Sequence, residues 1–408
     1  MTGAGDAVAR LVRDEGTRVL ATLVRVTGSV DLAEDAVQDA VVRALETWPR
    51  DGVPGNPRGW LLVAARRRAV DVVRREAKRQ GKEAIAMPDV DPCPDPVVVR
   101  DDLLRLVFTC CHPALSLDAQ VALALRTLGG LSTAEVARGL LVPEATMAKR
   151  LTRAKQKIAQ ARIPYRVPSA EELPARLAGV ASTVYLIFNE GYTGRVSLLA
   201  EGVRLARMLV SLMPDEPTAL GLLALVLLQD ARRLARFSSG VPVLLSAQDR
   251  SSWDASLIKE GVELVARGLR RTPSVPNAYV VQAAIAACHD LAPTYEETNW
   301  DAVISWYDVL LSVQDTPVVR LNRAAAVAER DGPASALALV DALAGLDDYP
   351  WWHASRAELL HRMGSASAFE ALARAVETGL PAPHAAQLRA RMESENPGQK
   401  ARGFDESG

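Results

Sequence analysis

The chain has few cysteines, few aromatic residues and no long apolar run, and each scarcity excludes a class of protein. Four cysteines in 408 residues cannot form the dense disulfide framework of a small secreted domain, and they suit a reducing compartment. The longest apolar run, residues 219–228, is about half of a bilayer span, so no membrane helix is expected. No basic-apolar signal pattern is present, and we therefore expect a cytoplasmic protein.

Motifs of common enzyme chemistry are also missing. The chain has neither a glycine-rich phosphate-binding loop nor a G-x-S-x-G nucleophile motif. Cys110, Cys111 and His112 could offer soft metal ligands. Ligands on adjacent residues rarely converge on one ion, however, and no second pair lies nearby. We therefore expect no catalytic residue, no bound metal and no cofactor.

The composition favours an all-α protein. Aromatic residues make up 5% of the chain, apolar residues 49% and charged residues 24%, with Ala, Leu, Val and Arg abundant. A chain of 408 residues is too long for one compact core, so several domains are expected. Lys and Arg number 25 against 20 Asp and Glu in residues 1–165, and 23 against 29 in residues 166–408. The basic front part is therefore the candidate for binding nucleic acid.

Residues 131–157 have the pattern of two short helices joined by a turn. Ser132 and Glu135 form a capping box at the start of the first helix, and Pro143 suits the first turn of the second. Apolar side chains at the spacing that packs two such helices together are Val136, Ala137, Leu140, Val142, Met147 and Leu151. The pattern predicts a helix-turn-helix that binds DNA in the major groove. An ordinary amphipathic hairpin with a solvated basic face is the alternative.

Two further helices precede this motif. The helix expected over residues 58–79 carries eight basic and two acidic side chains, which indicates either a phosphate-binding stripe or a solvated face. In the helix expected over residues 31–48 the acidic, polar face would carry Glu34, Asp35, Gln38 and Asp39. The inward face of that helix would carry Leu32, Ala36, Val37, Ala40, Val41 and Leu45. An acidic helix beside a basic one indicates a protein partner and a nucleic-acid partner, unless the acidic face is merely solvated.

Three segments, in this order and spacing, resemble the core of a bacterial RNA polymerase sigma factor of the extracytoplasmic-function class. They are DLAEDAVQDAVVRALETW, NPRGWLLVAARRRAVDVVRRE and LSTAEVARGLLVPEATMAKRLTRAK. The resemblance implies that residues 1–80 are region 2, which binds core polymerase and the −10 promoter element. It implies a linker over residues 81–100, and a region 4 over residues 101–165 that binds the −35 element.

The resemblance also implies roles for individual residues. Polymerase would be contacted by Asp35, Gln38 and Asp39. The loop over residues 49–57 would receive a flipped base of the −10 element. The melted strand would be held by Arg58, Trp60, Arg66, Arg67, Arg68, Arg74 and Arg75. The −35 duplex would be bound by Glu144, Thr146, Lys149, Arg150 and Arg153. Two positions depart from the family, which often has Asn where this chain has Arg67 and Gly where it has Leu141.

Residues 169–408 have the pattern of amphipathic helices separated by Pro and Gly. Two segments, beginning at Pro317 and Trp351, resemble each other, and their turns at Gly332 and Gly364 are 32 residues apart. This offset is close to the tetratricopeptide period, although ordinary helical pairs would also fit. The segments TCCHPALS, VYLIFNEGYTG, LLALVLLQDARR, LLSAQDRSSWD and VVRLNRAAAVAE are similar to a sigma subgroup with a tetratricopeptide-like C-terminal domain. We expect this domain to regulate the front part and to offer a surface for a regulatory protein or ligand.

Polar groups beside apolar helices in the rear part could line a ligand pocket, but buried hydrogen-bonded helix junctions are the commoner case. They are Asn189, Glu190, Tyr192, Gln229, Asp230, Arg232, Arg233, Gln248, Asp249, Arg250 and Trp253. The sequence therefore predicts a sigma factor that binds core RNA polymerase and promoter DNA. The alternative is a helix-turn-helix activator with a tetratricopeptide-like sensor, which would protect DNA without polymerase. An enzyme or metal protein built in the rear helices is a third possibility, supported only by these polar clusters.

Overall fold

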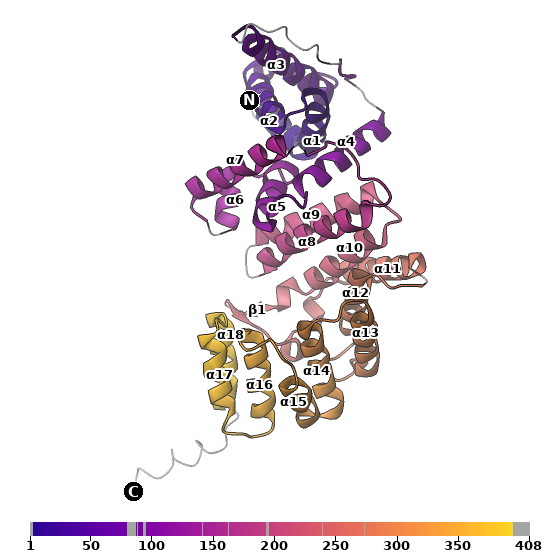
Figure 1. Cartoon of the computed structure of the whole chain (residues 1–408), viewed down its shortest axis with the longest axis vertical. Coiled ribbons are helices and arrows are strands. Elements are labelled where there is room, and N and C mark those ends of the chain that lie inside the picture. The colour runs from indigo at the N-terminus through magenta and orange to yellow at the C-terminus, as the bar shows by residue number, and fades with distance from the viewer. Residues whose placement is uncertain are drawn as a thin grey trace. The chain divides into compact units, whose positions relative to one another are not determined.

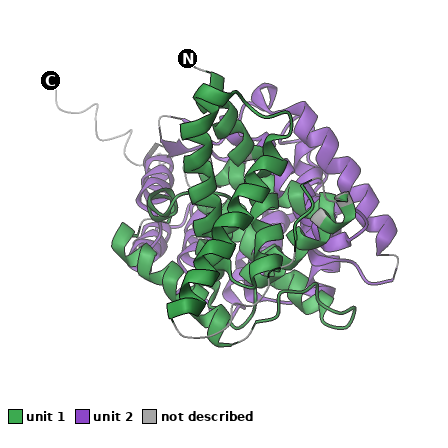
Figure 2. Cartoon of the chain, turned by 90° about the horizontal axis from the view of Figure 1, so that it is seen from above, with its two compact units in different colours: residues 1–213 green, residues 214–408 purple. Residues whose placement is uncertain are grey.

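The computed structural model describes residues 3–79, 87, 89–92, 95–140, 142–161, 163–192, 196–238, 240–272 and 274–394. In these residues the fold is all-α, as predicted, apart from a short antiparallel pair of strands, β1 (Phe237–Ser238) and β2 (Val241–Pro242). The chain forms two compact units, residues 1–213 and 214–408 (Figures 1 and 2). Among the described helices, none is long and apolar enough to span a bilayer.

The first three helices of unit 1 are α1 (Gly3–Thr27), α2 (Val30–Asp51) and α3 (Pro57–Arg79). The Ser29 hydroxyl accepts a hydrogen bond from the amide of Leu32 and so caps α2. The buried stripe of α2 consists of Val30, Ala33, Glu34, Ala36, Ala40, Ala44 and Trp48. Two expectations for this helix are therefore wrong. Glu34 is buried instead of lying on the acidic face, and Leu45 is 47% exposed, because the small alanines occupy the inward positions at a spacing of three and four.

The part of the chain expected to be region 4 contains α4 (Pro96–Cys110), α5 (Leu117–Leu123), the π-helical turn η1 (Ala124–Leu128), α6 (Thr133–Gly139) and α7 (Glu144–Gln160). Helix α4 begins earlier than the linker boundary at residue 100 implies, because the Asp95 carboxylate caps it. The capping box of Ser132 and Glu135 is present as predicted. Pro143 is the N-cap of α7 and precedes its first turn. The expectation for Leu141 falls outside the described residues.

Helices α8 (Leu173–Tyr192) and α9 (Val196–Leu212) pack against region 4 within unit 1. The Arg176 guanidinium donates to the carbonyl of Phe108 at 2.6 Å, and that of Arg204 donates to the carbonyl of Leu128 at 2.6 Å. A Cβ atom at Gly139 would lie 3.1 Å from the methyl carbons of Leu198. The compact unit that contains region 4 therefore extends to residue 213, whereas the sequence pattern places a domain boundary before residue 169.

Unit 2 is a succession of packed helices (Figure 1). They are α10 (Pro217–Ala231), α11 (Ala255–Arg271), α12 (Ala278–Asp290), α13 (Trp300–Val313), α14 (Pro317–Asp331), α15 (Pro333–Asp341), α16 (Pro350–Arg362), α17 (Ala368–Glu377) and α18 (Ala382–Ser394). The similar segments found in the sequence are the pairs α14–α15 and α16–α17. Gly332 and Gly364 adopt positive φ angles of 90° and 69° in their turns.

The connection between α10 and α11 contains the β-strands and the short 3₁₀ turns η2 (Arg233–Ala235), η3 (Leu245–Ala247) and η4 (Arg250–Ser252). The Arg250 guanidinium anchors it by donating to the carbonyls of His289 and Ala292, at 2.7 Å each. The same guanidinium lies 4.5 Å from the ring centroid of Trp253. Arg250 thus joins this connection to the end of α12 in a helix junction, whereas Nε of Arg232 and Oε1 of Gln248 are buried without a hydrogen-bond partner among the described residues. Asn189 and Glu190 belong to unit 1, and the side chain of Tyr192 lies outside the described structure.

Candidate nucleic-acid interface

Helix α7 presents one packed and one open face. Met147, Leu151 and Ala154 are buried against the rest of region 4. The five residues predicted for the −35 element lie on the other side, where Glu144, Thr146, Lys149 and Arg153 are exposed and Arg150 is half-buried. Four of them, all except Glu144, border a groove of about 400 Å³ between α7 and the start of α5. The Arg150 guanidinium lies 3.6 Å from the Asp118 carboxylate of α5.

Lys155 points away from that groove, toward region 2. Its ammonium lies 2.8 Å from Oε2 of Glu34 and 2.9 Å from Oδ1 of Asp31. Burial alone would lower the pKa of Lys155, but the two carboxylates outweigh it and raise the pKa. The Thr127 hydroxyl donates to the other oxygen of Glu34 at 3.3 Å. The buried carboxylate of Glu34 is thus paired with region 4.

A second polar cluster joins regions 2 and 4. The Asp102 side chain has no exposed surface, and it lies 2.9 Å from the Arg25 guanidinium and 2.8 Å from that of Arg105. The Tyr165 hydroxyl donates to the carbonyl of Ala21 at 2.8 Å. Burial, together with the nearby Asp102, raises the pKa of this phenol well above its usual range. Helices α1 and α4 pack along this contact, so the parts expected to be regions 2 and 4 form one compact body.

The cationic side chains of the basic helix α3 are of two kinds. Some pair with carboxylates of the same chain, and others are exposed. Intramolecular carboxylates pair with Arg58 (Glu15, 3.4 Å), Arg66 (Asp89, 2.7 Å) and Arg68 (Asp39). The side chains of Arg67, Arg74 and Arg75 are exposed. The pair of Arg68 with Asp39 joins a residue predicted to bind DNA to one predicted to bind polymerase. Not all of the expected stripe is therefore open to phosphates in this state.

A cavity of about 320 Å³ lies at the start of α3, bordered by Trp60, Arg67, Asn56 and the linker residue Pro92. Trp60 packs edge-on against Trp48 with ring centroids 5.3 Å apart. The Asn56 amide donates to the carbonyl of Pro92 at 3.4 Å, and a Cβ atom at Gly59 would lie 2.8 Å from the same carbonyl. The linker thus closes one side of a hollow that includes the end of the predicted base-binding loop.

The outer face of α2 carries the predicted polymerase contacts. Asp35, Gln38 and Asp39 are exposed. The same face continues with Val42 and Leu45, which are 53% and 47% exposed. The sequence pattern did not place these two apolar residues on this face, although Val42 follows Asp39 by three residues and Gln38 by four, and Leu45 follows Val42 by three. The face is therefore mixed, with an acidic part and an apolar part.

The front of the chain matches two known families. The model described as "Sigma-70 region 2" covers residues 11–79, and "Sigma-70, region 4" covers residues 105–158. The ECF RNA polymerase sigma factor SigK of Mycobacterium ulcerans (strain Agy99) is 31% identical over 36% of this chain and 82% of its own length. SigK of Mycobacterium tuberculosis (strain ATCC 25177 / H37Ra) is 33% identical over 33% and 74%. The chain belongs to the extracytoplasmic-function sigma factors.

Sigma factors direct promoter-specific transcription initiation by RNA polymerase, and they are not a class of enzyme. This sigma factor has a C-terminal extension, which begins with a match to a family of unknown function (DUF6596) over residues 176–269. An uncharacterized protein of Rhizobium meliloti (strain 1021), R00370, is 40% identical over 92% of this chain and 93% of its own length. That relative is similar to this chain in its extension as well as its sigma regions.

Proposed function

We propose that this sigma factor docks on core polymerase through α2, holds the melted −10 strand along α3 and binds the −35 duplex through α7, in the cytoplasm. One observation carries the proposal. The packed helix-turn-helix presents Thr146, Lys149, Arg150 and Arg153 together on one groove, away from its apolar seam. Such a cationic helix face matches both the phosphates and the base edges of a major groove.

The −10 function is supported by the hollow beside Trp60. An aromatic ring and the exposed guanidinium of Arg67 border a space large enough for a base. Base–aromatic stacking and cation contacts are how proteins hold single strands. Capture of an extruded base also offsets the cost of unstacking it, so the same site would assist promoter melting. Arg67 in place of the family's Asn favours contacts to the strand backbone.

The polymerase function is supported by the mixed face of α2. Asp35 and Gln38 are open to solvent beside Val42 and Leu45. An exposed apolar pair rimmed by polar groups is typical of a protein-binding surface. The acidic residues would orient the docking, and the apolar pair would supply buried area.

The extension would regulate the front part. Its first two helices, α8 and α9, already pack on region 4, through contacts such as those of Arg176 and Arg204. Regions 2 and 4 bind separate promoter elements, so their mutual contact at Lys155 and Glu34 must loosen in the initiation complex. An extension that packs on region 4 is placed to influence that equilibrium.

Run-off transcription with purified core polymerase tests these proposals. The full-length chain should produce promoter-dependent transcripts, and its footprint should require polymerase. Protection of DNA by the chain alone, with no transcripts, would instead support the activator alternative. The truncated chain should end at residue 213, because a chain ending at residue 168 would lose α8 and α9 and expose the region 4 core. Equal transcription and polymerase affinity of the full-length and 1–213 chains would refute regulation by unit 2 while leaving initiation intact.

A further inference from the structure

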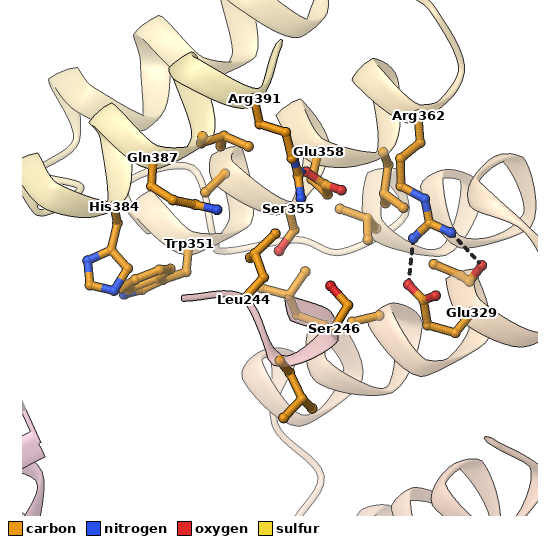
Figure 3. Close-up of a pocket in the computed structure, with 18 of the residues that line it drawn as sticks. Leu244, Ser246, Glu329, Trp351, Ser355, Glu358, Arg362, His384, Gln387 and Arg391 are labelled. Carbon is orange, nitrogen blue, oxygen red and sulfur yellow. Dashed lines mark hydrogen bonds and ion pairs between the residues drawn. The ribbon is translucent and has the colours of Figure 1, made fainter. Parts of the chain in front are cut away.

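Unit 2 contains a cavity of about 570 Å³ that no part of the proposed sigma mechanism uses. It lies between α14, α16 and α18 on one side and the turn η3 of the α10–α11 connection on the other. Figure 3 shows Leu244 and Ser246 of that connection directed toward the side chains of α16 and α18. Its volume is within the range of about 300–1,000 Å³ that is typical of small-molecule sites.

The floor of the cavity is apolar. Leu321, Leu359 and Leu388 come from α14, α16 and α18, and Ala325 leaves room between them. At one end the rings of Trp351 and His384 pack edge to face, with centroids 5.0 Å apart. Trp351 is 39% exposed, so its ring remains available to stack on a ligand.

The charges in the cavity compensate one another. The Arg362 guanidinium pairs with the Glu329 carboxylate at 2.5 Å, and Arg391 pairs with Glu358 (Figure 3). Burial and the nearby Arg236 lower the pKa of His384, so its imidazole is neutral at neutral pH. A charged ligand would therefore lose hydration without meeting an uncompensated opposite charge.

Uncharged polar groups also border the cavity. Nδ1 of His384 is buried and has no hydrogen-bond partner among the described residues, and the Ser355 hydroxyl and the Gln387 amide belong to the same lining. They come from the two neighbouring helices α16 and α18 and face the same space. Because a buried polar atom without a partner is costly, a bound molecule with hydroxyl, carbonyl or amide groups would be favoured there.

We propose that this cavity binds an uncharged small organic molecule with an apolar, ring-bearing body and hydrogen-bonding groups along one edge. The body would lie on Leu321, Leu359 and Leu388 beside the ring of Trp351. The polar edge would face Ser355, Gln387 and His384. The turn at Leu244–Ser246 would cover the ligand from the other side.

The test uses the full-length chain and two fluorescent probes with the same ring skeleton. N-phenyl-1-naphthylamine is uncharged, and 1-anilinonaphthalene-8-sulfonate carries an added sulfonate. Two variants each add a bulky ring to the lining of the cavity from a different helix: Ala325→Phe on α14 and Ser355→Phe on α16. Ala386→Phe, at an exposed position of α18 outside the cavity, is the matched control. Thermal unfolding of each variant checks that the fold is retained.

The uncharged probe should bind saturably with one site per chain, and more tightly than the sulfonate. Each blocking variant should weaken that binding about tenfold or more, while Ala386→Phe leaves it unchanged. Tighter binding of the sulfonate would overturn the uncharged ligand class. Equal binding by the blocking and control variants, or no saturable binding, would overturn the site itself. None of these outcomes depends on transcription, so they are separate from the test of sigma activity.

Discussion

The Lys155 ammonium donates to the buried carboxylate of Glu34 at 2.8 Å, across 121 residues of sequence. Lys155 belongs to the helix proposed to bind the −35 element, and Glu34 to the helix proposed to dock on polymerase. Glu34 is only 6% exposed, and its two carboxylate oxygens accept hydrogen bonds from Lys155 and from the Thr127 hydroxyl. This ion pair therefore joins the two helices that carry the proposed binding surfaces.

Replacing Lys155 with Met should destabilise unit 1 by roughly 1–3 kcal/mol, because the Glu34 carboxylate would stay buried without its cation. Urea unfolding followed by circular dichroism would measure the change. Lys157→Met is the matched control, since Lys157 is exposed on the same helix. This substitution should change the free energy of unfolding by less than about 0.5 kcal/mol. Equal losses of unfolding free energy in the two variants would show that the Lys155–Glu34 pair adds no specific stabilisation.

Replacing Lys149 or Arg153 with Ala should weaken binding of the holoenzyme to a −35 duplex, by about 1–3 kcal/mol for any contact that recognises a base. Competition with labelled promoter fragments at fixed salt would measure this loss. Gln156→Ala, exposed on α7 but outside the groove, should have no effect. Unchanged promoter selection after simultaneous replacement of Glu144, Lys149, Arg150 and Arg153 would contradict the role of α7.

Replacing Asp89 with Asn should strengthen binding of a single-stranded −10 oligonucleotide, because it removes a negative charge beside Arg66, whose guanidinium keeps its hydrogen bond to the carbonyl of Met87. Asp89 is 97% exposed, and an exposed ion pair is worth at most about 1 kcal/mol, so the gain should not exceed about fivefold. Fluorescence anisotropy would detect it. Asp118→Asn makes the same change in net charge in region 4 and should leave this binding as it was. A gain of equal size in both variants would indicate a general charge effect.

Two buried groups in the helix junction of unit 2, Asp290 and His289, should make the free energy of unfolding depend on pH in opposite directions. Burial, against the opposing effect of Arg232 and Arg250, raises the pKa of Asp290 to about 7. The folded state therefore binds more protons than the unfolded state between about pH 4 and 7, and this group makes stability fall as pH rises. Burial and the same two guanidiniums lower the pKa of His289 to about 4. This imidazole makes stability rise between about pH 4 and 6.5.

Asp290→Asn should remove the contribution of Asp290 to the pH dependence of stability and leave that of His289. Urea midpoints of the variant should increase from pH 4.5 to 6.5 more steeply than those of the unmodified chain. Asp348→Asn, at an exposed position, should leave the slope unchanged. If Asp290→Asn and the unmodified chain have parallel pH profiles, Asp290 does not titrate in this range.

Local signals in the sequence were reliable where neighbouring residues decide the structure. The capping box of Ser132 and Glu135 depends on atoms three residues apart, so it could be predicted and is present. The inward face of α2 was partly wrong because large apolar residues such as Leu45 were preferred over Ala44 as core candidates. The burial of Glu34 could not be predicted, since its partners Thr127 and Lys155 are far along the chain.

In the candidate sites too, features set by nearby residues could be predicted, and features set by residues far apart in the sequence could not. The cationic face of α7 follows from helical period alone. The pairing of Arg66 with Asp89 requires the linker to fold back, and the cavity of unit 2 joins residues from Leu244 to Arg391. No spacing rule connects positions so distant. The start of unit 2 after residue 213 was missed for a similar reason, because the helices α8 and α9 look like any other helical pair.

The packing of α8 and α9 on region 4 limits how this protein can be combined with others. A chimera that joins the sigma part of another protein to this extension directly after α7 would leave Leu198 and Arg204 facing a foreign surface. A junction between residues 213 and 214 keeps α8 and α9 in the same protein as the region 4 residues that they contact. The sequence match over residues 176–269 crosses that junction, so the matched segment is not a transplantable module by itself.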